Sequence, residues 1–191
     1  QFLPGISPPG NVLRLLRATV QRVEEDGRTT LATSDVIATL SLLSGIPLAM
    51  LDPSQPLGLD VIRAFLESRV IGQKEATDVL VDRVALVKSG LTDPTRPLGV
   101  FLFVGPTGTG KTELAKALTE LLFGNPSRLV RLDMSEYQTP DSLDRLLGDA
   151  NTDTSAAPVI ASVRRDPFSV VLLDEFEKAA APIRDLFLQL F

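Results

Sequence analysis

The sequence predicts an α/β fold with a doubly wound parallel sheet, preceded by a small helical segment. Three short runs indicate strands. LGVFLFVG is continuously apolar and rich in β-forming residues, as expected of a strand covered on both faces, and RLVRLD and SVVLLDE are the second and third candidates. Between the first two runs, KTELAKALTELLFG carries leucines at helical spacing and ends in the stop signal Gly124. Strands that alternate with helices favour parallel pairing, because each helix returns the chain to the end of the sheet where the preceding strand began.

Further helical patterns precede the first predicted strand. Residues 11–25 place apolar side chains at helical spacing, and a second pattern begins at Ser34 and ends at Gly45. Two more helices are predicted near residues 59–68 and over residues 73–89, where apolar residues again recur at helical spacing. The part of the chain before the predicted sheet is therefore expected to be mainly helical.

Breaks between these patterns divide the chain. The stretch DPSQPLGLD is the strongest linker signal, because proline and glycine interrupt regular structure there. We predict a helical segment over residues 1–51, a linker over residues 52–60 and an α/β domain over residues 61–191. The sequence starts at Gln1 and stops at Phe191 inside an apolar helical pattern, so a piece of a longer protein is expected.

Composition narrows the classes of partner and site. Acidic residues outnumber basic ones by 24 to 19, and the basic residues are scattered, which argues against nucleic acid as a partner. The chain has no cysteine and no histidine, which excludes disulfides and the usual zinc ligand sets. No apolar run approaches the ~18 residues of a membrane span, so no membrane partner is expected. A cytoplasmic location fits these properties.

The strongest chemical signal is a glycine-rich stretch between the first predicted strand and the helix that follows. It satisfies the Walker A pattern G-x-x-x-x-G-K-[ST] with residues Gly105, Pro106, Thr107, Gly108, Thr109, Gly110, Lys111 and Thr112. Its glycines let several backbone N–H groups face one centre, and the following helix adds its positive end. The pattern predicts a P-loop NTPase that binds ATP, with Lys111 on the β- and γ-phosphates and the Thr112 hydroxyl on Mg²⁺.

A second signal is the Asp-Glu pair that follows the predicted strand SVVLLDE. Ligands in open α/β sheets bind beyond the carboxyl ends of the strands, so Asp174 and Glu175 are expected to face the phosphate loop. Asp174 would hold the Mg²⁺ shell, and Glu175 would polarise a water for attack on the γ-phosphate. An isolated Asp-Glu after a strand is usually a solvated turn, but a phosphate loop in the same chain favours the catalytic interpretation.

These motifs also carry a family resemblance. RVIGQ, GPTGTGKTELAKALTELLFG, RLDMSEY and RRDPFSVVLLDEFEKA follow one another as in the second ATPase module of the Clp family of AAA+ protein-remodelling machines. The resemblance covers most of residues 66–191, and the upstream part is similar to the lid end of a first ATPase module. It implies that residues 1–51 are a remnant of that lid, and that residues 61–191 are an AAA+ nucleotide-binding domain truncated at its C-terminus.

The resemblance implies partners and ligands as well. It implies an ATPase that works as a ring of its own copies, usually a hexamer, with ATP and Mg²⁺ at subunit interfaces. It also implies polypeptide substrates and leaves open a docked peptidase. By the same resemblance Val70 and Ile71 would flank the adenine, although ordinary apolar packing explains these two residues equally well.

One segment departs from the family pattern. Threading members carry a Gly-rich pore loop with a Tyr that grips the moving polypeptide, whereas residues 149–159 read DANTDTSAAPV and contain no aromatic ring. Contact through Val159 or Ile160, threading by another ring, loss of grip and a solvated surface loop all remain open. The short connection before Ser34 also leaves no room for the long coiled coil of the disaggregating members.

The motifs together predict an ATP-binding and hydrolysing module of a Clp-type unfoldase or chaperone, in which Lys111 and Glu175 are catalytic. The alternative is a nucleotide-dependent assembly or scaffold ATPase that does not thread polypeptide. The missing aromatic residue favours this alternative, and the intact pair of Asp174 and Glu175 opposes it, because a binding switch needs no catalytic carboxylate. The fragment alone is expected to turn over ATP poorly.

Overall fold

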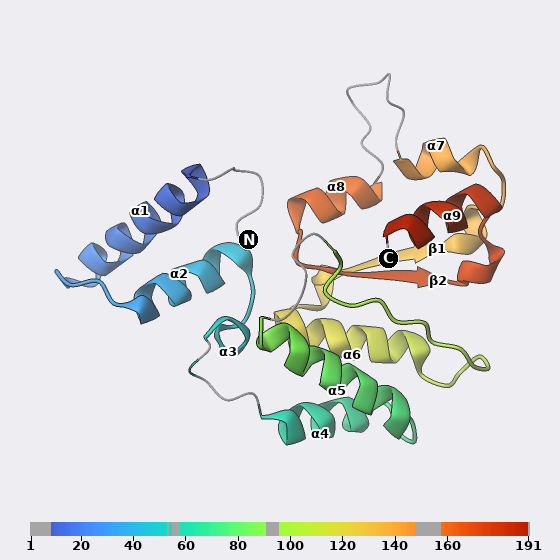
Figure 1. Ribbon diagram of the computed structural model, residues 1–191, viewed down its shortest axis with the longest axis horizontal. Coiled ribbons are helices and arrows are strands. Elements are labelled where there is room, and N and C mark those ends of the chain that lie inside the picture. Colours follow the sequence, from blue (N-terminus) through green and yellow to red (C-terminus); the bar gives the residue numbers. More distant parts are fainter. Residues whose placement is uncertain (1–8, 53, 55–57, 91–95, 148–157, 191) are drawn as a thin grey trace.

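The computed structural model describes residues 9–52, 54, 58–90, 96–147 and 158–190. Figure 1 shows a small parallel sheet with helices on either side and a pair of helices at the N-terminal end. The α-helices are α1 Gly10–Glu25, α2 Thr33–Ser44, α3 Leu48–Leu51, α4 Leu59–Arg69, α5 Lys74–Lys88, α6 Lys111–Phe123, α7 Ser142–Leu147, α8 Pro158–Arg165 and α9 Ala181–Leu190. The strands are β1 Leu129–Asp133 and β2 Val170–Asp174, and the 3₁₀ turns are η1 Pro126–Arg128, η2 Met134–Glu136 and η3 Phe176–Lys178.

The helices predicted from periodicity are confirmed with small shifts at their ends. The predicted stops Gly45 and Gly124 adopt left-handed backbone angles, with φ of 71° and 64°, directly after α2 and α6. Each of these glycines donates its N–H to the carbonyl oxygen four residues earlier, which closes the last turn. The signals that end these helices are therefore local and readable from the sequence.

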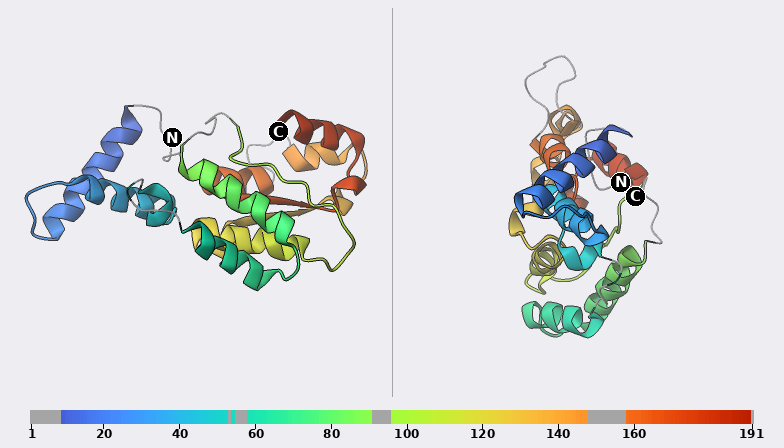
Figure 2. Two further views of the ribbon diagram at one scale, coloured as in Figure 1. Left: turned by 60° about the horizontal axis from the view of Figure 1, so that its bottom comes forward. Right: turned by 90° about the vertical axis from the view of Figure 1, so that its left-hand side faces the viewer.

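The sheet in the described part of the chain consists of β1 and β2, which run parallel. Their register pairs Leu129 with Val170 at one end and Asp133 with Asp174 at the other. Helix α6 packs against both strands, whereas α8 contacts β1. Figures 1 and 2 show that the start of α6 and the carboxyl ends of the strands lie on the same side of the molecule. This arrangement is the one that a phosphate loop requires.

The prediction that the run LGVFLFVG forms a strand of the sheet is wrong. Residues 99–104 are extended, and Phe101 and Phe103 stack with ring centroids 6.3 Å apart and pack against the core, while Leu102 and Val104 face outward. The alternation of buried and exposed side chains is that of a strand, but this segment forms no ladder with β1 or β2. An apolar run fixes which side chains are buried, not which strand supplies backbone partners.

Two apolar clusters form the core of the described chain. The first joins α4, α5 and α6, and its buried members are Ile62, Leu66, Val70, Leu80, Val81, Val84, Leu114, Ala117 and Leu118. The second lies at the other face of the sheet, and its buried members are Leu132, Met134, Tyr137, Leu146, Ala179, Ala180 and Ile183. The two clusters hold the sheet between helical layers, as expected of a doubly wound fold.

Two basic side chains connect the end of α2 and the segment after it to the α/β part of the chain. Arg128 donates to the carbonyl oxygens of Ser44 and Phe168, each at 3.2 Å, and Lys88 donates to the carbonyl oxygen of Asp52 at 2.5 Å. Hydrogen bonds to charged donors are among the stronger polar contacts in proteins. The N-terminal helices therefore contact the α/β part directly, and the domain boundaries given above remain a prediction.

The phosphate loop touches the first core cluster through one glycine. Gly110 precedes α6 with φ of 91°, and a Cβ at this position would lie 2.6 Å from Cγ1 of Val70. Val70 is 6% exposed and follows α4. Gln73, which precedes α5, donates from Nε2 to the Thr109 carbonyl oxygen at 3.3 Å. The turn between α4 and α5 thus packs directly on the loop that precedes α6.

Replacing Gly110 by Ala should destabilise the protein more than replacing Gly108 by Ala. Both glycines have left-handed φ, 91° and 82°, so both substitutions strain the backbone by about 1–2 kcal/mol. Only at position 110 would the new methyl group also overlap Val70, which should add about 1–3 kcal/mol to the loss in free energy of unfolding. Urea denaturation of the two variants measures the difference.

Val70→Ala is the control for this contact, because it removes both γ-carbons of the neighbour. In the Gly110→Ala background this second change should cost less than it does alone, giving a favourable coupling energy in the double-mutant cycle. Equal losses for Gly108→Ala and Gly110→Ala, without coupling to Val70, would contradict the close approach.

Candidate functional site

The phosphate loop of residues 105–110 curls ahead of α6. Gly108 and Gly110 both have positive φ, and nothing lies within 4 Å of the position that a Cβ on Gly108 would take. An L-residue disfavours such angles, so glycine is needed for this curvature. The N-terminal N–H groups of α6 have no partners within the helix, so this helix end attracts anions. The loop and helix together can bind phosphate oxygens.

Lys111 folds back over the phosphate loop. Its Nζ donates to the carbonyl oxygens of Gly105 at 2.8 Å and Pro106 at 2.7 Å. The Thr109 hydroxyl also donates to the Pro106 carbonyl oxygen, at 3.0 Å. The ammonium group is therefore already held at the loop.

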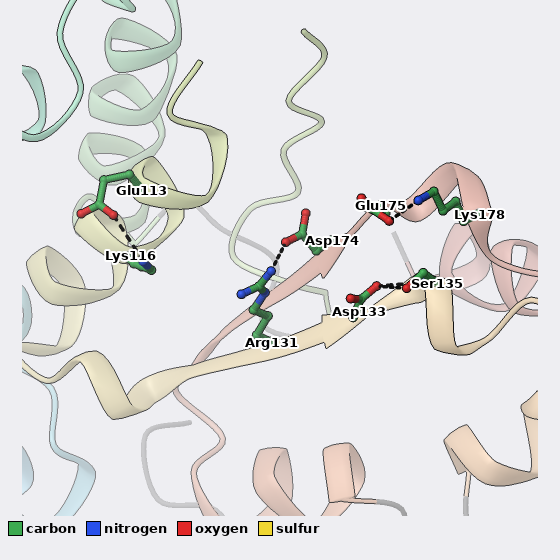
Figure 3. Close-up of polar contacts among 8 residues, drawn as sticks. All are labelled: Glu113, Lys116, Arg131, Asp133, Ser135, Asp174, Glu175 and Lys178. Atoms are coloured by element: carbon green, nitrogen blue, oxygen red, sulfur yellow. Dashed lines mark hydrogen bonds and ion pairs between the residues drawn. The ribbon is translucent and has the colours of Figure 1, made fainter. Parts of the chain in front are cut away.

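Asp174 and Glu175 lie at the carboxyl end of β2, where the sequence predicted them. Asp174 accepts a hydrogen bond from Nη2 of Arg131, a residue of β1, at 2.6 Å (Figure 3). Glu175 accepts from Nζ of Lys178 at 2.5 Å. Each of the two acids at the end of β2 is thus paired with one cation.

The backbone of Glu175 adopts an unusual conformation. Its φ of 54° and ψ of 42° are left-handed, and it is the one non-glycine residue with positive φ in the described part of the chain. Such angles cost a non-glycine residue of the order of 1–3 kcal/mol and are enriched at functional sites. This geometry turns the chain directly after Asp174, so that the two neighbouring carboxylates take different cations as partners.

Hydrogen bonds hold the charged groups at the ends of both strands. The hydrogen bond and charge of Glu175 raise the pKa of Lys178 above its ordinary value. Hydrogen bonds from the hydroxyl and backbone N–H of Ser135 lower the pKa of Asp133, the register partner of Asp174 (Figure 3). Lys178 stays cationic and Asp133 stays anionic at neutral pH, so this edge of the sheet is strongly polar.

The structure places the two predicted groups of site residues on adjacent elements. Helix α6 contacts β2, which brings the helix that begins at Lys111 beside the strand that ends at Asp174. No hydrogen bond or ion pair joins Lys111 or Thr112 to Asp174 or Glu175 among the residues described. The phosphate-binding half and the acidic half of the site are therefore not joined by a direct polar contact among these residues.

Val70 and Ile71, predicted to flank the adenine, have opposite environments. Val70 is buried in the first core cluster and packs against Gly110, whereas Ile71 is 89% exposed. The packing alternative therefore describes Val70 well, and Ile71 is open to a ligand. The adenine contact of both residues stays a prediction.

The residues present fit a magnesium nucleotide. No group of three or more acidic or cysteine side chains that could hold a metal occurs among the described residues. Mg²⁺ in phosphoryl-transfer sites needs few protein ligands, because phosphate oxygens and water fill most of its octahedron. Thr112 at the start of α6 and Asp174 at the end of β2 supply a hydroxyl and a carboxylate, which is the donor set of such sites.

Three contributors to the site were missed by sequence reasoning. Lys178 lies three residues after Glu175 in a helical turn, a spacing that brings side chains together, so this pair was readable. Arg131 could be placed on the same strand face as Asp133, but its pairing with Asp174 requires the register of two strands distant in sequence. Gln73 carried no local signal for its contact with the phosphate loop.

The predicted pore-loop segment lies mostly outside the described residues, which omit residues 148–157. Val159, in α8, packs against the second core cluster, so this side chain contributes to packing.

Within the described ranges, no helix is both long and apolar enough to cross a membrane.

Comparison with known proteins identifies the family. Residues 96–191 match the family model described as AAA domain (Cdc48 subfamily). The chain is 45% identical to the chaperone protein ClpB of Lactiplantibacillus plantarum over 161 residues, which is 82% of this chain and 19% of that protein. It is 37% identical to the ATP-dependent Clp protease ATP-binding subunit ClpL of Staphylococcus aureus RF122 over 183 residues, 94% of this chain and 26% of that protein.

A solved structure agrees with these relatives. The closed state of Hsp104 with ATPγS and FITC casein matches with a TM-score of 0.79 and 30% sequence identity, over 95% of this chain and 32% of that one. This likeness confirms the predicted α/β P-loop NTPase fold, and the chain spans only a fifth to a third of the proteins it matches. Because the family model covers half of the chain, the chain belongs to the AAA domain (Cdc48 subfamily) family, among its Clp-type ATPases.

Proposed function

We propose that this chain is the nucleotide-binding and hydrolysing part of a Clp-type protein-remodelling machine that works in the cytoplasm as a hexameric ring of its own copies. One observation carries the proposal: the phosphate loop ahead of α6 and the acids at the end of β2 lie on adjacent elements, at the same side of the sheet. Its similarity to ClpB, ClpL and Hsp104 supports work on polypeptides. The nucleotide is ATP, with Mg²⁺.

Binding begins at the phosphate loop. Backbone N–H groups of residues 105–110 and the N-terminus of α6 attract the phosphate oxygens. Lys111 exchanges its contacts with Gly105 and Pro106 for the β- and γ-phosphates. Thr112 and Asp174 would hold Mg²⁺, which when bound neutralises charge on the phosphate oxygens. Ile71, and Val70 at its edge, would line the adenine site.

Hydrolysis requires an oriented water, and Glu175 is the residue that we assign to this role. Its carboxylate lies directly after the proposed Mg²⁺ ligand Asp174 and is held by Lys178. A carboxylate in that position can accept the proton of a water that attacks the γ-phosphate. The ion pair with Lys178, at 2.5 Å, fixes where the Glu175 carboxylate lies at the end of β2.

The rival function, an assembly ATPase that does no work on polypeptide, is not favoured. The chain is similar to ClpB, ClpL and an Hsp104 structure that contains casein, all of the remodelling class. Residues 149–159 lack the aromatic ring that grips substrate in threading relatives. We therefore propose that polypeptide contact does not depend on an aromatic ring in this segment. A peptidase partner is a further proposal that rests on the similarity to ClpL alone.

Glu175→Gln should abolish hydrolysis but leave nucleotide binding intact. The substitution removes the proton acceptor and keeps the size of the side chain, so the ATPase rate should fall by about 10²-fold or more. The rate is measured on the full-length protein, and the affinity for a fluorescent ATP analogue is measured in parallel.

Glu177→Gln is the matched control, because Glu177 lies two residues away in η3 and has no role in the proposed chemistry. It removes the same charge and should keep the ATPase rate. Equal rates for Glu175→Gln and the unchanged protein would contradict the assignment of Glu175.

An unfolded model polypeptide such as casein should raise the ATPase rate of the full-length protein. A ring that performs work on a chain couples turnover to the presence of that chain, so the stimulation should disappear in Glu175→Gln. A steady basal rate that does not respond to polypeptide would favour the assembly function instead.

A further inference from the structure

The contact between Arg131 and Asp174 joins the two strands at the functional edge of the sheet. Leu132 and Leu173 contact the second core cluster, so Arg131 and Asp174 lie on the other face, where α6 packs. The Arg131 side chain reaches from β1 across to β2, and its Nη2 lies 2.6 Å from Oδ2 of Asp174 (Figure 3). The guanidinium thus occupies an oxygen of the carboxylate that we assign to Mg²⁺.

We infer that Arg131 is a positioning residue that competes with Mg²⁺ for the carboxylate of Asp174. The inference rests on the proposed function, since it takes Asp174 as part of the Mg²⁺ shell. A guanidinium and a divalent cation both seek the same carboxylate lone pairs. Before the nucleotide binds, Arg131 neutralises Asp174 and fixes its orientation. Because Mg²⁺ and the guanidinium would share one carboxylate charge, binding of Mg²⁺ with the phosphates favours release of that oxygen by Arg131.

The surroundings of Arg131 permit this release. Its side chain is 56% exposed, against 25% for Asp174. Asp133, the register partner of Asp174, lies on the same strand face as Arg131, and Ser135 holds it in its charged form. Arg131 therefore has space to move and retains an acidic neighbour after it leaves Asp174.

The same exposure limits the strength of the competition. Solvent-exposed ion pairs contribute little free energy, because water screens the charges and the long side chain loses freedom. Arg131 should therefore tune the Mg²⁺ dependence of nucleotide binding by a small factor and should not block the site.

The test is the Mg²⁺ enhancement of nucleotide binding, defined as the Kd of a fluorescent ATP analogue in EDTA divided by its Kd in saturating Mg²⁺. It is measured on the full-length protein, and the signal that persists in Lys111→Ala is subtracted. Arg131→Gln should increase the enhancement about two- to fivefold. Arg131→Lys keeps the charge and should stay near the unchanged protein, and so should the control Arg17→Gln in α1.

A second step separates competition from a structural effect. In an Asp174→Asn background the contested carboxylate is gone, so Arg131→Gln should no longer change the enhancement. Arg131→Ala serves as a second charge-removing variant, and circular dichroism checks that each variant is folded. An unchanged or smaller enhancement in the charge-removing variants, or the same increase in the Asp174→Asn background, would overturn the inference. Absence of any Lys111-dependent binding in the unchanged protein would instead overturn the proposed function itself.

Discussion

The close approach of Val70 to Gly110 is the constraint on which the site geometry depends. The first core cluster reaches the phosphate loop at this point, where a Cβ would lie 2.6 Å from Cγ1 of Val70. Because glycine permits both the contact and the left-handed turn, α6 can begin directly over the core. The Lys111 ammonium and the N-terminus of α6 are then presented at the edge where β1 and β2 end. Apolar packing thus sets the position of the polar groups that bind phosphate.

Each cation of the proposed site has a partner within the site. Lys111 contacts carbonyl oxygens of its own loop, Arg131 contacts Asp174, and Lys178 contacts Glu175. These cations are largely exposed, so each contact contributes little free energy. Binding of a magnesium nucleotide would therefore be an exchange of partners. The free energy gained on binding is the difference between the two sets of contacts.

The sequence predicted much of this site, for physical reasons that differ between elements. Helix α6 and the phosphate loop were readable because glycine, helix periodicity and the Lys111 position are local signals. Asp174 was predicted at the carboxyl end of a strand because the apolar run before it stops at this residue, and β2 does end there. The pairing of residues 99–104 was not predicted correctly, because a pattern of buried and exposed side chains does not specify which strand is the partner. The contact of Arg131 with Asp174 depends on strand register, which no local pattern contains.

If the loop before α6 binds ATP, equilibrium binding of ATP to the full-length protein will depend on Lys111. Lys111→Ala should weaken binding about ten- to hundredfold, as expected for the loss of charged hydrogen bonds to phosphate. Lys116→Ala removes an exposed lysine of the same helix, which pairs with Glu113 at 3.3 Å, and should bind like the unchanged protein. Equal affinities for the Lys111→Ala and Lys116→Ala variants would show that the loop before α6 does not bind the phosphates of ATP.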